Sequence, residues 1–76
     1  MTNSAKLEEI INNSGLKRSA IMKQLNITAY ETLRAKIENR RDFKASEIEK
    51  LCAVLGLDRD QREAIFFAHE AESHSA

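Results

Sequence analysis

Apolar residues recur along the chain at intervals of three and four positions, which is the spacing of amphipathic helices. The first such group is Leu7, Ile10 and Ile11. Asn3 or Ser4 is placed to cap a helix ahead of this group, and Gly15 can adopt the left-handed conformation that ends one. The pattern therefore predicts a first helix that ends at Gly15.

Two short helical patterns follow, one on each side of a tight junction at residues 25–28. The pattern before the junction covers about residues 17–24 and buries Ala20 or Ile21, then Leu25. The pattern after the junction covers about residues 29–38. Asn39 can end the helix over residues 29–38 in the left-handed conformation, although less readily than glycine.

The helix expected over residues 29–38 has one buried and one exposed face. Leu33 and Ile37 lie four positions apart, so they pack inward together and leave Arg34 on the opposite side. We expect Thr28 to cap this helix through its hydroxyl and Glu31 to complete a capping box. A short helix of this kind, with an outward arginine, is what a helix-turn-helix places in the major groove of DNA. Nucleic-acid binding is therefore the leading hypothesis.

Two more helices are predicted in the C-terminal half. The first carries Ile48, Leu51, Cys52 and Leu55. It begins either at a capping box over residues 46–49 or two positions earlier, at Lys44, and it ends at Gly56. Asp58 and Gln61 cap the last helix. No window alternates as a strand does. The pattern predicts an all-α, compact five-helix bundle, a single domain over residues 1–76 that is ordered over about 4–70 and frayed over 71–76.

Composition narrows the classes of function. The chain has 76 residues, no apolar run of the roughly 20 residues that span a bilayer, and no signal-peptide pattern at its start, so we expect a cytoplasmic protein without a membrane partner. Cys52 is the single cysteine, and His69 and His74 lack a metal-binding pattern. There is no glycine-rich phosphate loop. We expect no enzyme activity, cofactor, metal or small-molecule ligand.

The charges are unevenly distributed, although the formal net charge is zero. Residues 17–44 carry eight Lys and Arg against three Asp and Glu, a net of +5, and the rest of the chain carries four against nine, a net of −5. A polyanion responds to the local patch and not to the total charge. The central segment is therefore the expected DNA-binding region.

The ordered series of motifs resembles the lambda-repressor-like, or xenobiotic-response-element-type, helix-turn-helix family, in the form of small phage and prophage regulators. The matching segments lie within about residues 5–68 and are Gly15 to Arg18, Gln24 to Thr28, Leu33 to Asn39 and Phe43 to Leu57. The resemblance implies a five-helix domain, usually a homodimer, that binds operator DNA and regulates transcription. Met22 stands where the family usually has a small residue. The step from Thr28 to Leu33 is one residue longer than usual, which leaves the base-contact register open by one.

The resemblance implies two sets of DNA contacts on the helix at about 29–38 and around it. The base contacts are expected at Ala29, Tyr30, Glu31, Arg34 and Ala35. The phosphate contacts are expected at Lys17, Arg18, Thr28, Lys36, Arg40, Arg41 and Lys44. Arg34 can form two hydrogen bonds with guanine. Tyr30 either contacts DNA or packs on the preceding helix, and Glu31 either accepts from cytosine or caps its helix.

Adjacent residues on a helix point about 100° apart, so one of Phe66 and Phe67 is expected in the core and the other in the interface of a homodimer.

Two functions stay open. The first is a sequence-specific transcriptional regulator of the phage repressor type, with double-stranded DNA as its partner. The second is a protein-interaction module, similar to an antirepressor, that uses the same fold to bind another regulator. The zero net charge and the acidic outer helices keep the second open, and the basic recognition face favours the first.

Overall fold

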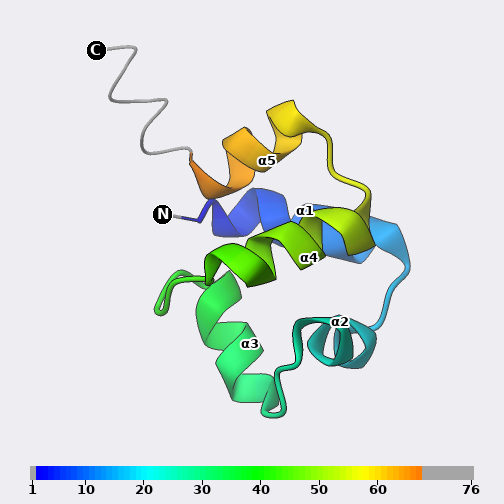
Figure 1. Ribbon diagram of the computed structural model, residues 1–76, viewed down its shortest axis with the longest axis vertical. Helices are drawn as coiled ribbons and strands as arrows, with labels where there is room; N and C mark the ends of the chain where they lie inside the picture. The colour runs from blue at the N-terminus through cyan, green and yellow to red at the C-terminus, as the bar shows by residue number, and fades with distance from the viewer. Residues whose placement is uncertain (1, 68–76) are drawn as a thin grey trace.

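The computed structural model describes residues 2–67, which form an all-α bundle of five helices (Figure 1). The helices are α1 Ser4–Ser14, α2 Arg18–Leu25, α3 Tyr30–Ile37, α4 Ala45–Leu55 and α5 Arg59–Phe66. Helix α1 packs against α3, α4 and α5, and α2 packs against α3 and α4. No strand occurs in this part of the chain. The predicted fold class, an all-α bundle of five helices, is confirmed.

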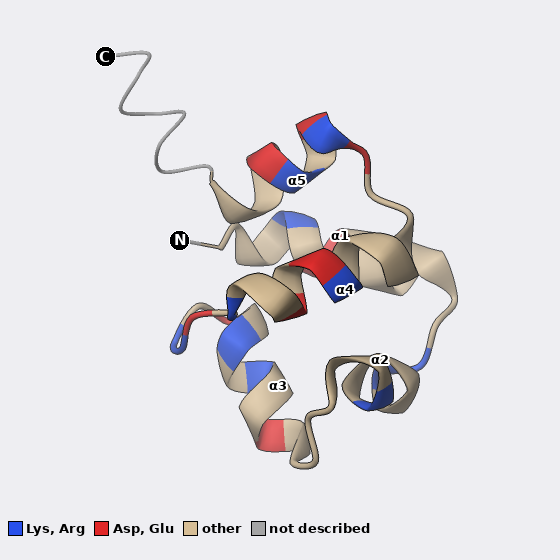
Figure 2. Cartoon of the chain, in the orientation of Figure 1, with Lys and Arg blue, Asp and Glu red and all other residues tan. Residues whose placement is uncertain are grey.

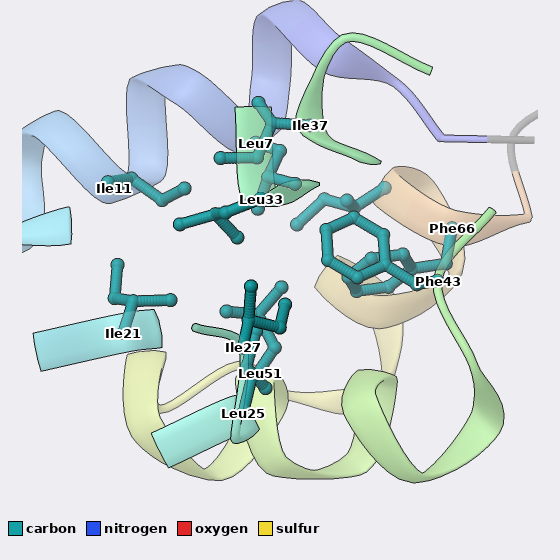
Figure 3. Close-up of a cluster of buried hydrophobic side chains, with 11 residues drawn as sticks. Leu7, Ile11, Ile21, Leu25, Ile27, Leu33, Ile37, Phe43, Leu51 and Phe66 are labelled. Atoms are coloured by element: carbon teal, nitrogen blue, oxygen red, sulfur yellow. The ribbon is translucent and has the colours of Figure 1, made fainter. Parts of the chain in front are cut away.

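Every helix contributes to one hydrophobic core (Figure 3). The most deeply buried side chains are Leu7, Ile11, Ile21, Leu33, Ile37, Leu51 and Ile65. Phe43 and Phe66 meet edge to face at one end of this cluster, with ring centroids 5.7 Å apart. Burying a side chain of this size contributes about 1.5–3 kcal/mol. The core therefore holds α2 and α3 in a defined position on the rest of the bundle.

The helix ends follow the predicted signals in most places. Asn3 caps α1 by accepting from the backbone N–H of Lys6, and Asp58 and Gln61 form a reciprocal capping box at α5. Gly15 and Gly56 end their helices in the left-handed conformation. Two asparagines also adopt the left-handed conformation at helix ends. Asn39 does so after α3, as predicted, and Asn26 does so after α2, which was not predicted from the sequence.

The predicted N-cap residue of α3 is wrong, although the helix starts within one residue of the predicted position. Ala29 is the N-cap residue and makes no side-chain hydrogen bond, while Thr28 lies one position too early to act as the cap. Glu31 consequently forms no capping box. The extra residue between Thr28 and Leu33 therefore precedes the helix, because Leu33 lies four positions after the N-cap residue Ala29.

Two alternatives left open by the sequence are also decided. Ile21 is buried in α2 and Ala20 is exposed. Helix α4 takes the earlier of its two possible starts, with Lys44 as its N-cap residue. Glu47 accepts a hydrogen bond from the Lys44 backbone N–H at 2.8 Å. This bond is one half of a capping box, and the other half cannot form because the lysine side chain has no acceptor atom.

Within residues 2–67, no helix has the length and hydropathy that crossing a membrane requires.

Candidate nucleic-acid interface

Helices α2 and α3 form a fixed pair because the junction between them is held by backbone hydrogen bonds and by a buried side chain. The backbone N–H of Ile27 donates to the carbonyl of Met22 at 2.9 Å, and that of Asn26 donates to Lys23 at 3.2 Å. The Ile27 side chain lies in the core with Leu25. The junction therefore presents α3 at a set angle to α2, with its first turn pointing away from the bundle (Figure 1).

Four of the five predicted base-contact residues are exposed at the start and on the outer face of α3. Ala29 and Glu31 are exposed, Tyr30 is 50% exposed, and the Arg34 side chain is 54% exposed. Half of Tyr30 is therefore accessible, so the residue is not fully buried against α2. These side chains are accessible to a partner, as the predicted base contacts require.

Two predicted contacts are contradicted by burial. Ala35 is 6% exposed, so it is not available to a base. Lys36 is 5% exposed, and its Nζ lies 2.6 Å from Oε1 of Glu47 on α4. An amine held in a buried ion pair does not reach a phosphate. We therefore remove both residues from the candidate interface.

Glu47 is the partner of Lys36 that sequence reasoning missed. Burial opposes the ionisation of its carboxyl, but hydrogen bonds from Lys36 and the Lys44 backbone N–H, together with the Lys36 charge, outweigh burial and lower its pKa. Glu47 is therefore ionised near neutral pH. The pair ties the last turn of α3 to the first turn of α4.

Four exposed charged side chains form a network on the outer face of α3, which we call the α3 ion-pair network. Its members are Glu31, Arg34, Glu38 and Arg40. The two arginines and two glutamates sum to no net charge. The Glu31 carboxylate therefore pairs with Arg34 and Arg40, and it neither caps α3 nor is left free to accept a hydrogen bond from cytosine. Arg40, predicted as a phosphate contact, is held in this network as well.

Basic side chains flank α3 on both sides. Within residues 2–67, Lys17, Lys23, Arg41 and Lys44 are exposed and make no ion pair. Figure 2 shows basic residues on α2, α3 and the loop that follows α3, while the α2–α3 junction itself is uncharged. Arg18 is half-buried and donates to Asn12 at 3.4 Å. Lys23 was not among the predicted phosphate contacts, although its place next to the junction qualifies it.

An open hollow of about 310 Å³ lies beside the junction. Its walls are Ser19, Met22, Lys23, Asn26, Ile27 and Thr28. Thr28, freed from the capping role, stands exposed at its rim. The hydroxyl is therefore available to an external acceptor, as the predicted phosphate contact requires.

The two aromatic residues at the end of α5 have different environments. Phe66 is 3% exposed and fills the core against Phe43, so its prediction as a dimer contact is wrong. Phe67 is half-buried beside the core and remains the candidate dimer contact.

Cys52 is half-buried, and burial raises the pKa of its thiol. His69 and His74 lie outside the described residues, among which no cluster of metal-ligand side chains occurs.

Comparisons of the chain with known protein families, with curated proteins and with solved structures find no match.

Proposed function

We propose that this protein binds double-stranded DNA as a sequence-specific transcriptional regulator, with α3 in the major groove. The observation that carries the proposal is the presentation of Tyr30 and Arg34 on the exposed face of α3. The rest of that helix is anchored in the core by Leu33 and Ile37. The short, rigid α2–α3 pair is the arrangement that a helix-turn-helix uses, and it agrees with the resemblance to small phage and prophage regulators.

The dimensions and charges suit this role. An α-helix with its side chains is about 10–12 Å across, and the major groove is about 12 Å wide, so α3 can enter it. The unpaired cations on each side are positioned for the two phosphate backbones: Lys17 and Lys23 from α2 and its approach, and Arg41 and Lys44 beyond α3. Phosphate contacts set the register, and Arg34 and Tyr30 then read bases.

The proposal includes a homodimer. A single domain reads only a few base pairs, which gives weak specificity against a genome of competing sites. A two-fold pair doubles the footprint and is the commonest homo-oligomer. The end of α5 lies on the opposite side of the bundle from the start of α3 (Figure 1). We expect its C-cap residue, Phe67, to supply an apolar contact for the dimer. The half-sites would lie roughly 34 Å apart.

Selection of bound sequences from random duplex DNA tests the proposal directly. We expect an enriched motif with two related half-sites. We expect the affinity for it to fall with salt by a log–log slope of about −0.9 per phosphate neutralised. If the full chain retained no duplex at low salt, or bound without any dependence on salt, DNA binding would be refuted.

A second candidate function is a protein-interaction module that binds another regulator. The α3 ion-pair network favours it, because its charges cancel and a neutral polar face suits a protein partner better than a polyanion. The same selection separates the two, since only the first function yields an enriched sequence. Where it yields none, Arg34→Ala should weaken capture of the partner regulator.

A further inference from the structure

The α3 ion-pair network is closed, in the sense that each glutamate contacts both arginines. Arg34 Nε donates to Glu38 Oε2 at 3.0 Å, and Arg34 Nη1 lies 4.0 Å from Glu31 Oε2. Arg40 Nη2 donates to Glu31 Oε1 at 3.0 Å and to Glu38 Oε1 at 2.9 Å, and its Nε also donates to Glu38 Oε1. Arg40 therefore bridges the start of α3 to the end of α3 from the loop that follows.

The two arginines are used differently within the network. Arg40 has its Nε and Nη2 groups bound to carboxylates. Arg34 has only its Nε bound, and among the described residues neither of its Nη groups makes a hydrogen bond. A guanidinium presents five donors in a rigid fork, so fixing one side orients the other. The Nη groups of Arg34 make no hydrogen bond within residues 2–67, although Nη1 lies 4.0 Å from Glu31, so they retain the donors that a guanine accepts from.

The network does not contribute much to folding stability, because its side chains are 37–66% exposed and exposed ion pairs are weak. Its effect is on the orientation of Arg34. A long arginine side chain otherwise samples many rotamers, and ordering it on binding costs entropy. Hydrogen bonds from Arg34 and Arg40 lower the pKa of Glu38, so this carboxylate stays ionised while it holds them.

We propose that Glu38 and Arg40 are specificity-determining positioning residues: they hold the Arg34 guanidinium on the exposed face of α3 so that its Nη groups, which make no hydrogen bond within the described chain, can read a guanine. This rests on the proposed DNA-binding function. Glu38 acts directly, through the hydrogen bond to Nε. Arg40 acts through Glu38 and Glu31, by fixing both carboxylates in place. Arg40 is therefore assigned to the orientation of another side chain and not to a phosphate.

Adjacent arginines provide a matched comparison. Arg40→Gln and Arg41→Gln remove the same charge from neighbouring positions, but only Arg40 belongs to the network. Glu38→Gln is paired with Glu63→Gln, which removes a carboxylate from an exposed pair with Arg59 on α5. Each protein is assayed as the full chain against the selected duplex and against a duplex with one base pair replaced. That base pair is the one at which Arg34→Ala loses discrimination.

The ratio compared is the dissociation constant for the substituted duplex divided by that for the selected duplex. We expect Glu38→Gln and Arg40→Gln each to lower this ratio by about fivefold. This factor corresponds to the interaction energy of an exposed ion pair at the upper end of its usual range. Glu38→Gln should also tighten binding to non-specific duplex, because it removes a negative charge near the phosphates. Arg41→Gln should weaken both duplexes equally, and Glu63→Gln should leave the ratio unchanged.

Three results would overturn the inference while leaving DNA binding intact. They are an unchanged ratio in Glu38→Gln and Arg40→Gln, an equal fall of the ratio in Arg41→Gln, and a wild-type duplex preference that Arg34→Ala does not relax at any base pair. A wild-type chain that selects no duplex would instead overturn the proposed function, and this inference with it. Thermal unfolding of each variant confirms that a changed ratio is not a loss of fold.

Discussion

Replacing Lys36 by methionine tests how α3 is held on the bundle. The side chains of Lys36 and Glu47 are only 6% and 10% exposed, and their charged atoms are 2.6 Å apart. Methionine has a similar length and keeps the apolar contacts of the lysine stem. It leaves the Glu47 carboxylate buried with the Lys44 backbone N–H as its remaining donor. The substitution therefore isolates the loss of the charge partner.

Removing one partner of a buried ion pair costs about 3–5 kcal/mol. Glu47 keeps one hydrogen bond and a small exposed area, so we expect the lower end, about 3 kcal/mol in the free energy of unfolding. A domain of this size has a net stability of about 3–5 kcal/mol. At about 4–8 °C per kcal/mol, the Tm should fall by roughly 12–24 °C. Much of the protein would then be unfolded at moderate temperature.

Urea denaturation near neutral pH, followed by far-ultraviolet circular dichroism, measures the change. Lys50→Met is the control, because Lys50 is exposed on α4 and makes no ion pair within the described residues. The double variant Lys36→Met/Glu47→Leu should recover most of the loss, since an apolar pair of similar volume has no buried charge. A stability of Lys36→Met within about 0.5 kcal/mol of wild type, the range of ordinary surface substitutions, would refute this reasoning.

Three further predictions concern acid stability, DNA reading and assembly. The pKa of Glu47 is below its ordinary value of 4.5 in the folded chain, so its contribution is present above pH 4.5 and lost as the pH falls through the lowered pKa; acid titration of Glu47→Gln should show a smaller loss than wild type, and equal losses would contradict this. Arg34→Ala should reduce discrimination at one base pair by roughly 5- to 150-fold, whereas Arg41→Ala should weaken all duplexes alike; equal effects in competition binding would remove Arg34 from base reading. Phe67→Ala should shift sedimentation equilibrium toward the monomer, and a wild type that is monomeric both free and on DNA would exclude the dimer.

The helices were predictable from the sequence because their signals are local. Gly15, Gly56 and Asn39 end helices as single residues in the left-handed conformation, and Asp58 caps α5 within its own turn. Thr28 misled the prediction because a good capping residue one position away from the cap looks the same in sequence. Only the packing of Leu33 decides between the two registers.

The site was predicted less completely because two of its features depend on contacts between segments. Lys36 follows Leu33 by three positions and therefore lies on the buried stripe, but its burial requires Glu47 from another helix, and no sequence pattern pairs them. The Arg34–Glu38 pair has the four-residue spacing that sequence can identify. The return of Arg40 onto Glu31 depends on the chain reversal at Asn39 and could not be read from spacing.

The backbone N–H of Asn3 donates to the carbonyl of Ile65 at 2.6 Å, so the two ends of the described chain meet beside α1. This contact affects the order of folding during synthesis. Ile65 and Phe66 belong to the same core as Leu7, so α1 lacks part of its packing surface until almost the whole described chain has left the ribosome. The nascent chain therefore exposes apolar surface on α1 until α5 docks. Docking should then be fast, because the sequence contains no proline to impose a slow isomerisation.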